Sequence, residues 1–422
     1  MAGALEGIRI LEFSEIIAAP FAGMLLSDMG AEVIKVEPTA GEPWRLQAQF
    51  MPGESRMFMS LNRGKRGLAI DLKTAEGREI IHKLAPSMDV VIINYRPDTP
   101  YNLGIDYETL SALNPSLIYV ENTAYGRKGP WAYRPGYDII AQAVTGLMAA
   151  NGKTNEKGLP QAMSPAMADF STGLSICWAV CAALFARERT GKGQKVEASL
   201  MGTALAVQTG TFMEIDSVDA DTQGLIRGRV REARTRGASF EEIQAIRSEA
   251  RPMFGNAYYR CYFTQDGVVA VGCLSDALRR RAAAAIGVKD PRFEDPNWQP
   301  MTPESRAAGA KVVEEAEAIM RTKTTEEWVR IFDAAGVPAG PFRSVDELRT
   351  DPQVVENDLI VELEHSLVGH LKMVGPPLKF SETPSEARSA SPALGEHNDE
   401  VLSELGYDAA AIAAMREKGV IR

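Results

Sequence analysis

Histidine and cysteine are both scarce in this chain, with 4 residues of each among 422. The histidines show no pattern typical of a Ser-His-Asp triad or a zinc site: His82, His365, His370 and His397. The cysteines lack CxxC and metal-ligand spacing and are too few for a disulfide framework: Cys177, Cys181, Cys261 and Cys273. We therefore expect no metal, and this cysteine usage favours a reducing cytoplasm.

Several common motifs are also missing. The sequence contains no GxGxxG, GxSxG, HExxH or P-loop pattern. Residues 14–20, SEIIAAP, stand after the first expected strand, where a dinucleotide-binding protein would have its glycines. Any chemistry must therefore rest on carboxylates, tyrosine, lysine, arginine and backbone N–H groups.

Positive charge is in deficit, because the formal net charge is −10. A chain without an overall basic field is not expected to bind nucleic acid or an anionic membrane. The N-terminal residues lack the pattern of a signal peptide, and the uncharged run 170–186 is too short and too rich in Ser, Thr and Gly to predict a membrane span. A polyanionic ligand would need a local cluster of Lys and Arg.

The first 125 residues alternate between strand and helix patterns. Strands are expected at residues 8–13, 32–37, 68–72, 89–94 and 117–122. Helices are expected at 20–29, after Thr74, and at 107–114. This alternation predicts an α/β fold, with a Rossmann-like, doubly wound parallel sheet.

The later part of the chain has a different character. Residues 227–251 are heavily charged and helical in pattern, which suits a solvated or subunit-bridging helix or, alternatively, a phosphate-binding segment. Residues 258–264 and 268–274 predict a β-hairpin of a smaller α+β domain. After Pro338 the sequence reads as loop-rich until a helix at 399–417.

We divide the chain accordingly. A large domain is expected at 1–205, completed by the C-terminal segment 350–422, with a small α+β domain at 225–330. Residues 206–224 and 331–349 are the expected linkers.

Polar residues gather at the carboxyl ends of the expected strands, where ligands of doubly wound sheets bind. The residues at these ends are Ser14-Glu15, Glu37, Lys73, Asn94-Tyr95-Arg96 and Asn122-Thr123.

A single carboxylate, Asp169, precedes an uncharged helical pattern at residues 170–186. The pattern starts near Phe170 or Ser171, so we expect Asp169 at or just before the N-cap, ionised at neutral pH. It is either a capping residue or a carboxylate nucleophile. This segment alone leaves both open.

Four segments together resemble the class III (CaiB/BaiF-type) CoA-transferases, a family that also includes α-methylacyl-CoA racemases and carnitine and formyl-CoA transferases. They are residues 5–38, residues 62–78, residues 168–174 with 187–194, and LGEHNDEVLSELGY at 394–407. The resemblance covers nearly the whole chain. It implies a CoA-transferase that moves CoA from an acyl-CoA to a free carboxylic acid, and an interlocked homodimer.

The resemblance assigns catalytic roles to Asp169, Asp138 and Tyr137. Asp169 would be the nucleophile, passing through an aspartyl anhydride and an aspartyl-CoA thioester, and Asp138 would position it. Racemases have His where this chain has Tyr137. Because a phenol is a poor base at neutral pH, transfer is favoured, with a racemase as the alternative. A non-catalytic CoA-binding protein is a further alternative.

The resemblance also implies contacts with CoA. Ile17 and Ala18 would border the thioester, and the nucleotide would lie along Ile70, Asp71, Leu72 and Lys73 with Asn94, Tyr95 and Arg96. The pantetheine would follow Arg134, Pro135, Gly136 and Tyr137. Formyl-CoA transferases have arginines where this chain has Pro38 and Asn102. Candidates to replace these cations are Arg45, Arg63, Lys65 and Arg96.

Overall fold

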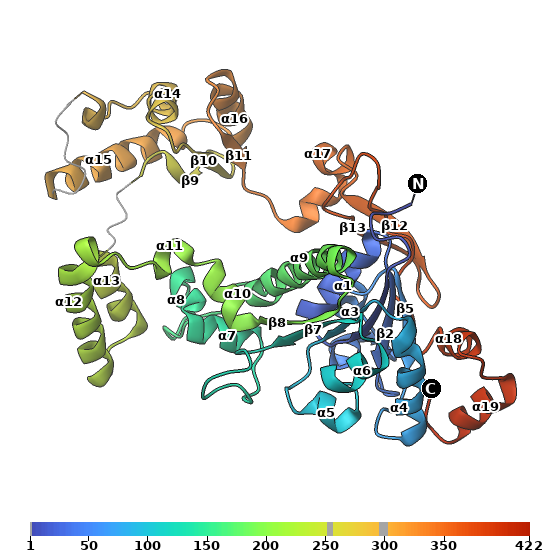
Figure 1. Ribbon diagram of the computed structural model, residues 1–422. Coiled ribbons are helices and arrows are strands. Elements are labelled where there is room, and N and C mark those ends of the chain that lie inside the picture. Colours follow the sequence, from blue (N-terminus) through green and yellow to red (C-terminus); the bar gives the residue numbers. More distant parts are fainter. Residues whose placement is uncertain (1, 251–255, 295–302) are drawn as a thin grey trace. The chain divides into compact units, whose positions relative to one another are not determined.

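A computed structural model describes residues 2–250, 256–294 and 303–422. The chain forms two compact units, which are coloured along the sequence in Figure 1. The larger unit comprises Met1–Ile215 with Val355–Arg422, and the smaller unit comprises Asp216–Val354.

A six-stranded sheet of parallel strands forms the centre of the larger unit. Its strands are β1 (Arg9–Phe13), β2 (Glu32–Glu37), β5 (Lys65–Ala69), β6 (Val90–Ile93), β7 (Ile118–Thr123) and β8 (Gln194–Ser199). They are ordered β5-β2-β1-β6-β7-β8. The winding direction reverses between β1 and β6, and ligands of such sheets bind at the carboxyl ends beside that point.

Helices cover both faces of this sheet (Figure 1). On one face, α1 (Ala18–Asp28) and α9 (Met167–Thr190) pack on alternate strand residues such as Ile10 and Val90. On the other face, α4 (Ala75–Leu84), α6 (Tyr107–Leu113) and the C-terminal α18 (Asn398–Glu404) and α19 (Ala409–Glu417) pack on Leu11 and Val91. Both faces of the central strands are therefore buried, and the charged residues Glu12 and Lys35 that β1 and β2 carry there pair with each other.

The helix α9 is long and apolar enough to cross a membrane by length and composition. In this fold it packs against α1, and the contact is close at Gly173. A Cβ atom there would lie 2.7 Å from the carbonyl oxygen of Ala18. One side of α9 is therefore packed closely within the larger unit.

The structure corrects several expected elements. The strand expected at 68–72 is β5 (Lys65–Ala69), because Ile70 and Asp71 pair instead with Ile421 and the carbonyl of Val420. The single helix expected at 399–417 is divided into α18 and α19, since Gly406 has a φ of 85°. The segment predicted to be loop-rich contains a hairpin, β12 (Ile360–His365) with β13 (Gly369–Val374). The strand β8 was not predicted.

The smaller unit contains the predicted hairpin. Its strands β9 (Tyr259–Phe263) and β10 (Val268–Gly272) are antiparallel and pair with β11 (Ala339–Pro341). A core around Trp328 joins this sheet to α14 (Asp276–Ile286), α15 (Pro303–Met320) and α16 (Thr325–Ala334). The charged segment is helical, as predicted, and forms α12 (Asp216–Thr235) and α13 (Phe240–Ala250), although Arg251 lies outside the described residues.

The chain also contains shorter elements. They are α2 (Pro43–Leu46), β3 (Gln49–Met51), β4 (Glu54–Ser55), α3 (Arg56–Met59), α5 (Thr99–Leu103), α7 (Asp138–Thr145), α8 (Leu147–Asn151), α10 (Leu200–Ala206), α11 (Thr209–Phe212) and α17 (Pro352–Val355).

Candidate active site

Asp169 lies inside the first turn of α9. The helix begins at Met167 with Ala166 as its N-cap, so Asp169 is its third residue and not the cap that the sequence predicted. Only 7% of the surface of Asp169 is exposed to solvent. The uncharged pattern placed the start of this helix near Phe170 or Ser171, after Asp169. The helix in fact begins before Asp169, at Met167.

Asp138, the first residue of α7, caps α9 from outside. Its Oδ1 accepts hydrogen bonds from the backbone N–H groups of Ala168 (2.8 Å) and Asp169 (3.2 Å). Its Oδ2 accepts one from Nε2 of Gln142 at 2.6 Å, and Oε1 of Gln142 accepts the N–H of Met163. The side chain of Asp138 therefore fixes the turn that carries Asp169 and places a second carboxylate beside it.

This environment changes the ionisation of Asp169. Burial, with the Asp138 carboxylate as a second cause, raises its pKa from 3.8 to about 7. The sequence had predicted an ionised group at neutral pH because helix N-termini favour anions. Because burial and the nearby Asp138 carboxylate both disfavour the charged form, Asp169 is only partly ionised near pH 7.

Asp169 opens into a small cavity of about 60 Å³ at the carboxyl ends of the strands. Its lining includes four residues predicted for the site: Asn94, Gly136, Tyr137 and Asp169. The others are Glu15, Ile16, Asn122, Thr123, Ala124 and Leu200. We call it the Asp169 cavity.

A larger cavity of about 330 Å³ shares Glu15 with the first one. Six of the predicted contacts line it: Ile70, Asp71, Leu72, Lys73, Tyr95 and Arg96. The remaining lining residues are Glu15, Val36, Glu37, Pro38, Thr99 and Leu103. Lys73 and Arg96 supply the positive charge among these residues. This volume is within the range of small-molecule sites, and we call it the strand-end cavity.

The other predicted contacts lie outside the linings of these two cavities. Ile17 is the N-cap of α1, and Ala18 is buried in an apolar cluster with Ala168. The exposed guanidinium of Arg134 lies 5.2 Å from the ring centre of Trp131. The carbonyl of Pro135 accepts a hydrogen bond from the hydroxyl of Tyr125 at 3.4 Å.

The side chains of three of the four proposed phosphate-binding cations are committed elsewhere. Arg45, Arg63 and Lys65 are each 2% exposed or less, and they pair with Glu37, Asp28 and Glu12 at 2.8, 2.6 and 2.9 Å. Because these three side chains are buried in ion pairs, they are not available to a ligand. Arg96 remains, with a half-exposed side chain 3.5 Å from Asp98.

Four residues that line the cavities were marked by their strand-end positions but were not assigned a role: Glu15, Glu37, Asn122 and Thr123. Glu15 lines both cavities, and burial raises its pKa. Asn122 is 4% exposed, and its Oδ1 has no hydrogen-bond partner among the described residues.

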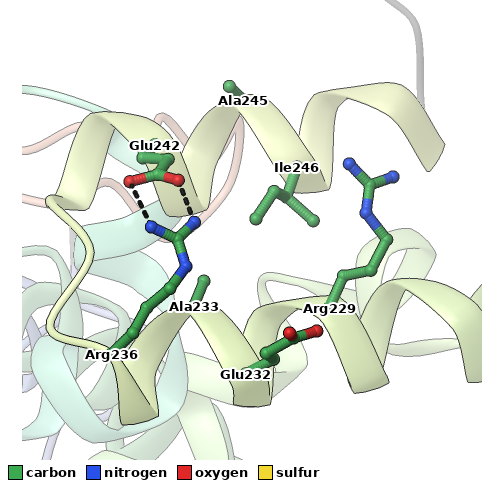
Figure 2. A pocket seen from close by; sticks show the side chains of 7 residues that line it. All are labelled: Arg229, Glu232, Ala233, Arg236, Glu242, Ala245 and Ile246. Carbon is green, nitrogen blue, oxygen red and sulfur yellow. Dashed lines mark hydrogen bonds and ion pairs between the residues drawn. The ribbon is translucent and has the colours of Figure 1, made fainter.

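A third cavity, of about 370 Å³, lies between α12 and α13 and is shown in Figure 2. In it, Arg236 forms an ion pair with Glu242, and Ala233 and Ile246 lie between the helices. Its charged lining residues are Arg229, Arg236, Glu232 and Glu242, whose charges offset each other. This cavity therefore gives no support to a phosphate-binding segment.

Comparisons with known proteins agree on one family. The model described as CoA-transferase family III matches residues 5–398. An acyl-CoA transferase of Fusarium pseudograminearum is 33% identical over 99% of this chain and 88% of its own length. Succinyl-CoA:glutarate CoA-transferase of Mus musculus is also 33% identical, over 99% of this chain and 90% of its own.

A solved structure shares the fold. That of Rv3272 from Mycobacterium tuberculosis matches with a TM-score of 0.75 at 28% identity, covering 95% of this chain and 99% of that one. The chain therefore belongs to CoA-transferase family III, and it is an enzyme of that family.

Proposed function

We propose that this enzyme transfers CoA from an acyl-CoA to a free carboxylic acid, with Asp169 as its nucleophile. The observation that carries the proposal is the buried carboxylate of Asp169, whose backbone N–H donates to Asp138 and which lines a cavity beside a larger one bearing Lys73 and Arg96. A carboxylate that titrates near pH 7 is available as an attacking anion at physiological pH.

The proposed reaction has four steps. A carboxylate oxygen of Asp169 bonds to the thioester carbon while the carbon–sulfur bond breaks, which gives a mixed anhydride and the CoA thiolate. The thiolate then attacks the aspartyl carbonyl, releasing the donor acid and leaving an aspartyl-CoA thioester. The acceptor carboxylate attacks this thioester and expels the thiolate. Finally, the thiolate attacks the acceptor's acyl carbon and returns Asp169 as a carboxylate.

We place CoA along the strand ends of a Rossmann-like domain. The phosphates would meet Lys73 and Arg96 in the strand-end cavity, and the pantetheine would pass Glu15 toward Asp169. Binding energy from this distant handle would fix the thioester against the carboxylate.

Racemisation is the weaker alternative. The relatives described above are named as transferases. Tyr137, which lines the Asp169 cavity, stands where a racemase base would be required. A racemase would exchange the α-hydrogen of a 2-methylacyl-CoA in deuterated water, whereas a transferase would not.

We also propose a cytoplasmic homodimer, interlocked as the family resemblance implies. Large apolar side chains on α9 support a subunit interface, because Leu174, Trp178 and Phe185 are 54%, 70% and 65% exposed. A monomer in analytical ultracentrifugation would contradict this proposal.

A screen of acyl-CoA donors against free carboxylic acids tests the function. The new thioester is detected by mass spectrometry, and the succinyl-CoA and glutarate named for the mouse relative belong in the panel. Incubation with acyl-CoA and hydroxylamine should modify Asp169. Asp169→Asn should abolish transfer, while the control Glu108→Gln, an exposed carboxylate on α6, should not. Transfer by Asp169→Asn at the parent rate would refute the proposal.

A further inference from the structure

The loop between β1 and α1 contains a strained residue. Ile16 has a φ of 71°. In this left-handed region a β-branched side chain crowds the backbone, and such strain persists only where the surroundings impose it. Ile16 lines the Asp169 cavity, and the preceding Glu15 lines both cavities. The strain therefore lies at the proposed active site.

Three side chains hold the backbone of this loop. The N–H of Ile16 donates to Oε2 of Glu42 at 2.8 Å. Asn94 binds both polar groups of Glu15, accepting from its N–H at 3.0 Å and donating to its carbonyl at 2.8 Å. The ammonium of Lys35 donates to the carbonyl of Ser14 at 2.8 Å. Consecutive peptide groups are thus fixed from outside the loop.

The side chain of Glu42 binds the N–H of Ile16 and does not cap its own helix. Glu42 is the N-cap residue of α2, yet its side chain makes no capping hydrogen bond with that helix. Its side chain is 2% exposed and lies 3.3 Å from the fully buried ammonium of Lys35, which also pairs with Glu12. Burying these charges costs free energy that directed hydrogen bonds must offset. The Oε2 atom of Glu42 accepts its hydrogen bond from Ile16, the residue of this loop with a positive φ.

We propose that Glu42, held by Lys35, is a positioning residue that keeps Ile16 in its strained conformation, so that Glu15 and Ile16 form the wall between the two cavities. The inference rests on the proposed CoA-transfer function. Without the hydrogen bond, Ile16 would relax toward negative φ and move this wall, so the thioester would be held less accurately against Asp169.

A double-mutant cycle between positions 42 and 16 tests the proposal. Glu42→Leu removes the acceptor, while Ile16→Gly removes the strain because glycine adopts positive φ freely. With Ile16 present, Glu42→Leu should lower kcat/KM for acyl-CoA about tenfold or more. When Ile16→Gly is also present, the same substitution should cost less than about threefold.

A conservative variant completes the design. Glu42→Gln keeps a neutral acceptor of the same shape, so its loss should be smaller, about threefold, and should again disappear with Ile16→Gly. If Glu42→Leu fails to fold, the cycle with Glu42→Gln decides the question. Thermal unfolding of each variant separates lost activity from lost structure.

The outcomes are distinct. Equal losses with Ile16 and with glycine would overturn the inference, because Glu42 would then act on something other than the strained residue. A larger loss for Glu42→Gln than for Glu42→Leu would overturn it as well. If the parent protein transfers no CoA, the proposed function fails first, and this inference fails with it.

Discussion

The raised pKa of Asp169 predicts that Asp169→Asn stabilises the protein above pH 7. The folded chain releases this proton near pH 7, whereas the unfolded chain releases it near 3.8. Between these values the folded state binds more protons, so the free energy of unfolding falls as pH rises, and it stays lower above pH 7. The difference of about 3 pKa units corresponds to an upper bound of about 4 kcal/mol at 1.36 kcal/mol per unit. Asparagine has nearly the shape of aspartate, and its backbone N–H can still donate to Oδ1 of Asp138. It carries no buried charge, however.

Urea titrations of the parent and of Asp169→Asn at intervals from pH 4 to pH 9 measure this difference. We expect nearly equal stability at the lowest pH and an advantage for the asparagine variant that grows until about pH 7 and then stays constant. The control Glu108→Gln changes an exposed carboxylate, so its effect should stay within about 0.5 kcal/mol throughout. A variant less stable than the parent at pH 8 would show that the ionised carboxylate is stabilised in the fold, which would refute the reasoning.

Three further predictions concern the site and its support. Because the ionised carboxylate attacks, acylation of Asp169 in single-turnover assays should rise about tenfold per pH unit below pH 7 and level off above it, and Asp138→Asn should move this limb to lower pH. Lys73→Ala and Arg96→Ala should each raise KM for acyl-CoA about fivefold or more, with a smaller effect on an N-acetylcysteamine thioester, which lacks the phosphates; equal effects on both substrates would contradict the phosphate contact. Arg45→Ala should lower the free energy of unfolding by about 3–5 kcal/mol in urea titrations, because it leaves the buried Glu37 without its partner; an unchanged stability would show that the pair is dispensable.

Much of the α/β core follows from local pattern. Strands β1, β2, β6 and β7 were predicted to within one residue at each end, because each contains several β-branched or other large apolar residues in a short segment. The strand β8, QKVEAS, lies at the edge of the sheet and has only two apolar residues among its six, so it lacks that signal. The hairpin of β12 and β13 carries several charged residues at exposed positions, and for this reason the segment was predicted to be a loop.

The sequence did not predict which positively charged side chains would be free to bind a ligand. Arg45, Arg63 and Lys65 were candidates for the phosphates together with Arg96, and nothing in their local sequence marks them as buried. In the fold the first three are buried against acids distant in sequence, and Arg96 is half exposed. No local pattern distinguishes these cases, because the pairing depends on which elements meet.

The sequence by itself determined the family, the parallel sheet and the gathering of polar residues at the strand ends, because hydrophobic periodicity and motifs are local properties of the chain. Only the tertiary structure decided the ionisation of Asp169, the hydrogen bonds of Asp138 and Glu42, and the conformation of Ile16. Each depends on groups brought together from separate segments, and a pKa or a strained dihedral angle is set by that surrounding of charge, burial and hydrogen bonds.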